Sequence, residues 1–67
     1  MNVKVEDLLY LVGGNTKVII GFQSYDKFYE IWRGKVDDID WNDIPFGYRV
    51  IENVTVVNGE DWLQIWV

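Results

Sequence analysis

The chain contains neither cysteine nor histidine, and this limits what can hold it together. A domain of 67 residues buries only about 60% of the surface that its unfolded chain exposes, so its stability is marginal. Disulfides and ordinary zinc sites, which often stabilise small domains, are both excluded. An efficient apolar core or oligomerisation must replace them. Four Trp, four Tyr and three Phe favour such a core, since each buried aromatic removes roughly 150–250 Å² from water.

Residues 1–67 are predicted to form a single domain, because they contain no repeat, linker or low-complexity stretch. The N-terminal part has the i, i+3, i+4, i+7 spacing of an apolar helix stripe, at Val5, Leu8, Leu9 and Val12. Glu6 and Asp7 would lie at the positive end of the helix dipole. Gly13–Gly14 would end the helix in a left-handed cap. We therefore expect a helix over about residues 4–12.

The rest of the chain predicts four strands, over residues 16–22, 27–36, 49–57 and 62–67. Residues 23–26 are a plausible turn, and Asn58–Gly59 is a strong hairpin signal. Between the hairpins, Asp40 would cap one helical turn at residues 41–44, which Pro45 stops. The predicted fold is α+β: one helix packs on a four-stranded antiparallel sheet, and a loop with a short helix joins the two hairpins.

Both faces of this sheet are expected to be apolar. In a strand, successive side chains point to opposite faces of the sheet. In the second strand one face would carry Phe28, Trp32 and Val36, and the other Tyr29 and Ile31. In the fourth strand, Trp62 and Trp66 oppose Leu63, Ile65 and Val67. A single short helix covers only one face. The sheet therefore curls toward a small barrel or is covered by the short helix, or its second face forms a homodimer or binds another partner.

We expect no enzymatic activity, no catalytic residue and no cofactor. Histidine and cysteine are absent, and Ser24 in a predicted turn is the only serine. Gly13–Gly14 follows a helix rather than opening one, so it is not a phosphate-binding loop.

We also expect no metal site. Residues 38–42 match the Asp-x-Asp-x-Asn start of a calcium loop. However, Asp43 stands where that loop needs glycine, and Arg49 stands where it needs a bidentate glutamate.

Membrane association and secretion are not expected. The longest apolar run near the N-terminus, residues 8–12, is shorter than a signal peptide requires, and Glu6 and Asp7 precede it. No run approaches the length of a membrane span. The expected location is the cytoplasm.

Direct nucleic-acid binding is not expected either. Tyr29, Arg33, Lys35 and Trp66 could form a base-stacking platform. Phosphate binding depends on Lys and Arg, however, and six bases stand against eleven acids.

The acidity is concentrated between the hairpins, where residues 36–47 carry aspartates and no base: Asp37, Asp38, Asp40 and Asp43. One interpretation is a solvated connection with Ile39, Trp41 and Ile44 turned inward. The other is an imitation of the nucleic-acid backbone, in which Trp41 is either a core residue or a hydrophobic anchor. The candidate partner-binding residues are Asp37, Asp38, Asp40, Trp41 and Asp43.

Three segments carry a resemblance: Val-Glu-Asp-Leu-Leu-Tyr-Leu, Thr-Lys-Val-Ile-Ile and Trp-Asn-Asp-Ile-Pro-Phe-Gly-Tyr-Arg-Val. With the terminal aromatic hairpin, they resemble short uncharacterised phage and prophage open reading frames of Gram-positive or gut bacteria. Small acidic proteins from phages resemble anti-CRISPR inhibitors. The resemblance implies a protein-binding inhibitor of a host nucleic-acid-binding defence protein, acting in the host cytosol. The alternative is a structural or assembly protein that homodimerises through an apolar sheet face.

Overall fold

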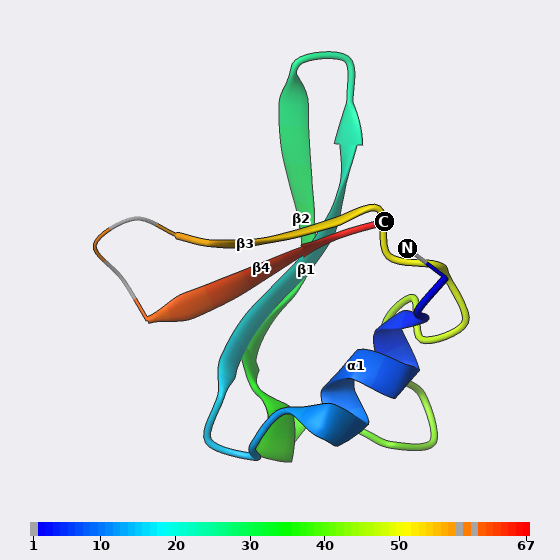
Figure 1. The fold of residues 1–67 in the computed structure, drawn as a ribbon, viewed down its shortest axis with the longest axis vertical. Coiled ribbons are helices and arrows are strands. Elements are labelled where there is room, and N and C mark those ends of the chain that lie inside the picture. Colours follow the sequence, from blue (N-terminus) through cyan, green and yellow to red (C-terminus); the bar gives the residue numbers. More distant parts are fainter. Residues whose placement is uncertain (1, 58, 60) are drawn as a thin grey trace.

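The computed structural model describes residues 2–57, 59 and 61–67, which form an α+β fold (Figure 1). Its elements are α1 (Val5–Leu11), β1 (Lys17–Ser24), β2 (Lys27–Lys35), the 3₁₀ helix η1 (Val36–Asp38), β3 (Asn53–Val56) and β4 (Trp62–Trp66). The predicted helix and the four predicted strands are confirmed in type and order. The predicted Asn58–Gly59 turn includes Asn58, which lies outside the described residues.

The sheet is mixed, so the prediction of a wholly antiparallel sheet is partly wrong. Its strand order is β2-β1-β4-β3. The two hairpins are antiparallel, but β1 and β4 pair in parallel. This order places the more apolar β4 at the centre and the short β3, with Asn53 and Thr55, at an edge. A short polar strand tolerates an edge better than a long apolar one does.

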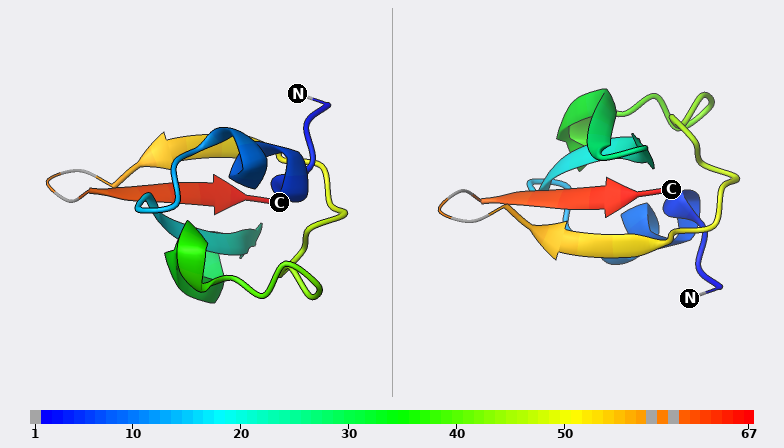
Figure 2. Two further views of the ribbon diagram at one scale, coloured as in Figure 1. Left: turned by 90° about the horizontal axis from the view of Figure 1, so that it is seen from below. Right: turned by 90° about the horizontal axis from the view of Figure 1, so that it is seen from above.

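The sheet is strongly twisted but does not close into a barrel, which corrects the expectation of barrel-like curling. The β3–β4 hairpin crosses the β1–β2 hairpin at a steep angle in Figure 1, and β2 and β3 remain as edges. Figure 2 shows the connection from η1 to β3 passing round the end of the sheet at which both termini lie. That connection is what allows β3 to take the outer position.

Helix α1 packs on one face of the sheet through the predicted stripe. Val5 and Leu9 are fully buried, and Leu8 and Val12 pack against the same cluster. The remaining buried members come from both hairpins and the connection: Val18, Ile20, Val36, Ile39, Ile51, Ile65 and Val67. Burying an aliphatic side chain stabilises a fold by roughly 1.5–3 kcal/mol, so this single cluster replaces the missing disulfides and metal.

The N-terminus of α1 is tied to the connection. The N–H of Val5 donates to the Arg49 carbonyl and that of Glu6 to the Gly47 carbonyl, both at 3.0 Å. Helix N-termini leave such donors without partners inside the helix. Residues 47–51 therefore serve as a backbone cap, and the predicted strand over 49–57 shortens to β3, with Val50 making an isolated bridge to Lys4.

The C-terminus of α1 does not have the predicted left-handed glycine cap. Val12 is already extended, with φ −92° and ψ 154°. The chain turns directly after α1 to reach β1. The N–H of Thr16 closes this turn by donating to the Gly13 carbonyl at 2.9 Å. Gly14 has another role, because a Cβ there would clash with the carboxylate of Asp37.

A β-bulge at Ile31 overturns the predicted faces of β2. Ile20 pairs with Trp32, whereas Gly21 pairs with Glu30, so Ile31 has no partner in β1. An extra residue reverses the alternation on either side of it. Trp32 consequently packs on the core, while Phe28 lies on the opposite face. The predicted alternation in β4 is confirmed, since Leu63, Ile65 and Val67 all pack in or against the core.

The predicted helical turn at residues 41–44 is wrong, and η1 forms earlier instead. Residues 40–43 make a β-turn, in which the N–H of Asp43 donates to the Asp40 carbonyl at 2.9 Å. Oδ1 of Asp40 accepts the N–H of Asn42 at 3.0 Å. Asp40 therefore stabilises a turn through its own side chain and does not begin a helix.

Candidate functional site

The outer side of α1 and the connection form an acidic–aromatic surface, which comprises Tyr10, Leu11, Asp37, Asp38, Asp40, Trp41 and Asp43. Trp41 packs on Tyr10 with ring centroids 4.8 Å apart. Tyr10 is 74% exposed, Leu11 80% and Trp41 40%. Trp41 is thus neither a core residue nor free in solvent, because one side of its ring rests on the helix.

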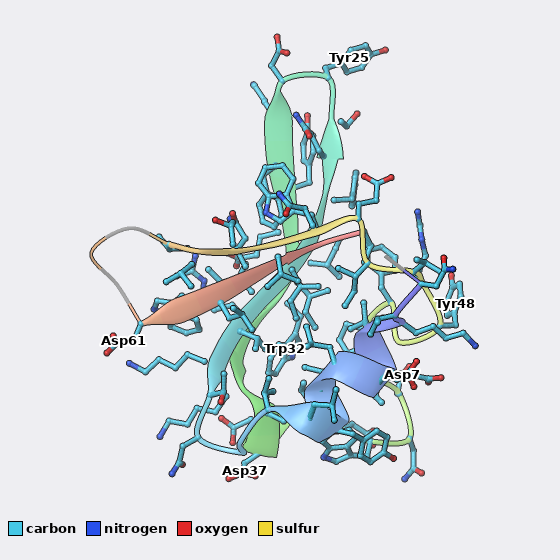
Figure 3. The ribbon with its side chains drawn as sticks, viewed as in Figure 1. Asp7, Tyr25, Trp32, Asp37, Tyr48 and Asp61 are labelled. Carbon is cyan, nitrogen blue, oxygen red and sulfur yellow. The ribbon has the colours of Figure 1, made fainter. Side chains whose placement is uncertain are left out.

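All four aspartates of this surface are exposed. Among the described residues the structure records one ion pair, between Arg33 and Glu30 on β2, so no Lys or Arg neutralises these aspartates at close range. Figure 3 shows Asp37, a residue of η1, and Asp7 of α1 at the edge of the half of the molecule that contains the helix. Glu6 and Asp7 add negative charge to that edge.

The face of the sheet away from α1 has a different character. We call it the cationic–aromatic face, and it comprises Lys17, Ile19, Phe28, Glu30, Arg33, Lys35, Trp62, Gln64 and Trp66. Nζ of Lys17 lies 5.7 Å, and Cζ of Arg33 5.1 Å, from the centre of the Trp62 ring. Both distances fit cation–π contacts.

The second indole of this face is held by two neighbours. The rings of Trp66 and Phe28 have centroids 4.9 Å apart, and Nε1 of Trp66 donates to Oε1 of Gln64 at 2.9 Å. Gly21 makes room for this arrangement, because a Cβ there would lie 2.6 Å from the Phe28 ring. Beneath the long side chains, Ile19 is only 3% exposed although it lies outside the core under α1.

The charge of the cationic–aromatic face opposes that of the whole chain. Lys17, Arg33 and Lys35 give +3 and Glu30 gives −1, so the face carries +2, while the net charge is −5. Lys17 and Lys35 are direct cross-strand partners. Like charges in that position destabilise a sheet.

The predicted partner-binding residues are all exposed and belong to one connection, and Trp41 contacts Tyr10 of α1, which the sequence prediction did not include. Tyr10 and Leu11 lie outside the apolar stripe of α1, and that position is the signal that would have identified them. Of the residues weighed as a base-stacking platform, Arg33, Lys35 and Trp66 share the open face. Tyr29 does not, because it stacks on Phe22 at 5.4 Å on the other side.

Metal ions, pockets and membrane spans are three further features to consider in the part of the chain that the structure describes. This part of the chain contains no group of three His, Cys, Asp or Glu side chains that could hold a metal ion, and no pocket. None of its helices has the length and apolar character needed to cross a membrane. Comparison of the chain with protein-family models, curated proteins and solved structures finds no match.

Proposed function

We propose that this chain is a non-catalytic protein-binding domain and that the acidic–aromatic surface is its docking site. The observation that carries the proposal is the exposed contact between Trp41 and Tyr10, in which Trp41 belongs to a connection whose exposed aspartates form no ion pair with the described residues. Tryptophan and tyrosine are among the residues most enriched at interface hot spots. A half-exposed Trp supported from one side is well placed to enter a pocket of a partner.

The charge around this contact supports a partner with a basic surface. Local charge of one sign steers an oppositely charged partner and raises the rate of encounter. Proteins that bind phosphate groups carry many Lys and Arg side chains on the binding surface, so such a surface would attract these aspartates. The proposed partner is therefore a nucleic-acid-binding protein, whose groove the aspartates occupy in place of the phosphate backbone.

The resemblance to short phage and prophage reading frames supports a biological setting for such an interaction. In that setting the partner is a host defence protein that acts on nucleic acid, such as a CRISPR effector, and the chain is its inhibitor in the host cytosol. Occupation of the groove would exclude the natural nucleic acid by direct competition.

Two triple variants of equal net charge test the proposal. One carries Asp38→Asn, Asp40→Asn and Asp43→Asn, in which the asparagine introduced at position 40 can still cap the turn. The control carries substitutions of exposed acids outside the surface: Asp26→Asn, Glu52→Gln and Asp61→Asn. Each variant is immobilised and exposed to a host lysate, and any captured nucleic-acid-binding protein is then purified.

The expected result is capture by the wild type and the control, but not by the first variant. The purified partner should also lose binding to its own nucleic acid when the wild-type chain is added. Equal capture by both triple variants would contradict the proposal, as would capture that 0.5 M salt, about an order of magnitude above low-salt buffer, does not weaken.

A further inference from the structure

The lysine pair at one end of the sheet brings two like charges together across neighbouring strands. Lys17 and Lys35 face each other across β1 and β2, and no carboxylate among the described residues forms an ion pair with either. The structure thus holds two cations side by side on an open sheet face. An anion bound between them would remove their repulsion.

The same face presents flat aromatic surface next to this cationic end. Trp62 is the direct partner of Lys17 across β1 and β4. Trp66 follows four residues later on the same side of β4, about 13 Å along the strand at 3.3 Å per residue. Both tryptophans are half-buried, with Lys17 and Arg33 over the ring of Trp62 and Phe28 against that of Trp66.

We propose that the cationic–aromatic face binds a short segment of single-stranded nucleic acid. Unpaired bases stack on aromatic rings, and their phosphates bind Lys and Arg. The separation of Trp62 and Trp66 fits a segment of a few nucleotides, with its backbone passing Lys17 and Lys35. The expectation from composition, six bases against eleven acids, treats the charge as evenly spread, whereas the structure concentrates three of the bases on this face.

The opposite sign of the remaining surface makes the proposal more specific. With +2 on the face and −5 overall, the rest of the chain carries −7. A rigid duplex would bring its second strand close to that negative surface, and its bases would not be free to stack. A peptide of acidic residues would satisfy the lysines but would offer no planar groups to the indoles. Binding at this face does not depend on the protein-docking role of the acidic–aromatic surface.

Tryptophan fluorescence provides the test, because Trp62 and Trp66 lie on the face while Trp32 and Trp41 lie elsewhere. The full chain is titrated with a ten-nucleotide single-stranded DNA at low salt. The test variant is Lys17→Gln with Lys35→Gln, which removes the repulsion and should fold at least as well as the wild type. The control of equal charge is Lys4→Gln with Lys27→Gln, both exposed and off the face.

We expect quenching for the wild type and the control, and at least about tenfold weaker binding for the test variant. With the two lysines neutralising phosphates, log K should fall with log salt with a slope of about −1.4, and the test variant should show little salt dependence. Quenching should persist in Trp41→Phe. Absence of quenching at low salt would overturn the proposal. Equal losses in both lysine variants would do the same, as would equal binding of a duplex or of polyglutamate.

Discussion

The acidic–aromatic surface and the cationic–aromatic face each contain tryptophan and charge, but their architecture differs. Trp41 lies in a turn and rests on Tyr10 of α1. Trp62 lies on the inner strand β4, with Lys17 and Arg33 near its ring. The two regions meet at η1, where Lys35 is followed two residues later by Asp37. Residues of opposite charge can therefore be neighbours in the sequence and still belong to different surfaces of the fold.

The backbone supports of the two regions are also unequal. The acidic turn is held by the contacts between Asp40 and residues 42 and 43. The cationic–aromatic face is part of a hydrogen-bonded sheet in which β1 pairs on both sides. Changes in the turn should therefore stay local, whereas changes on the face should be transmitted to the core.

Two glycine substitutions provide the strongest contrast. In Gly21→Ala, the new Cβ would clash with the Tyr29 carbonyl oxygen and lie 2.6 Å from the Phe28 ring. The backbones of β1 and β2 are hydrogen-bonded and cannot move apart without loss of pairing. We therefore expect a loss of about 2–3 kcal/mol in the free energy of unfolding. In Gly14→Ala, the three nearest atoms all belong to the exposed Asp37 carboxylate, which can rotate into solvent. The expected loss is below about 1 kcal/mol.

Urea denaturation of both variants measures this difference. Gly59→Ala is not a suitable control, since φ is +79° there. Gly13→Ala is better, because the nearest atom to its Cβ, in Thr16, would be 3.8 Å away. An equal loss of stability in Gly14→Ala and Gly21→Ala would contradict the view that the acidic–aromatic surface adapts to substitutions and the cationic–aromatic face does not.

The two tryptophans should differ in the same direction. Trp62→Ala removes a half-buried ring that contacts Lys17 and Arg33, so we expect a loss of about 2 kcal/mol, less than for a fully buried Trp. Trp41→Ala removes one aromatic contact at a half-exposed site and should cost about 1 kcal/mol. Thermal denaturation measures both. A larger loss for Trp41 would mean that the acidic–aromatic surface is part of the core.

The sequence predicted elements better than it predicted their arrangement. Helix α1 and its stripe were predictable because local spacing alone defines them. The parallel β1–β4 pair was not, since it depends on where a long connection places β3. The bulge at Ile31 was also not predicted, although Gly21 lies opposite it in β1, and it placed Phe28 and Trp32 on opposite faces.

The same limit applies to the candidate sites. The aspartates of the acidic turn lie close together in sequence, so they were found together. Lys17, Lys35 and Trp62 are distant in sequence and become neighbours only through strand register. A net charge cannot reveal such segregation, because it sums over all faces of the fold.

Neutralising the acidic turn should stabilise the domain slightly. Asp38→Asn, Asp40→Asn and Asp43→Asn together relieve repulsion among exposed carboxylates while the turn cap is kept. We expect a gain of about 0.5 kcal/mol at low salt that disappears at high salt, where the Debye length falls to about 3 Å. Thermal denaturation at two salt concentrations measures the gain. A loss of stability would show that these aspartates are structural.

The smallest effect is expected for the ion pair on β2. Nη2 of Arg33 lies 2.7 Å from Oε1 of Glu30, but the two side chains are 50% and 41% exposed. A pair so open to solvent contributes little, so Glu30→Gln should lower the free energy of unfolding by less than about 0.5 kcal/mol in urea denaturation. The same change raises the charge of the cationic–aromatic face from +2 to +3. Binding of single-stranded DNA should therefore become tighter, because the face loses its one negative charge. The free energy of unfolding should barely change, because the ion pair contributes little to it. A loss above about 1 kcal/mol would instead make Glu30 part of the scaffold that holds Arg33 over Trp62.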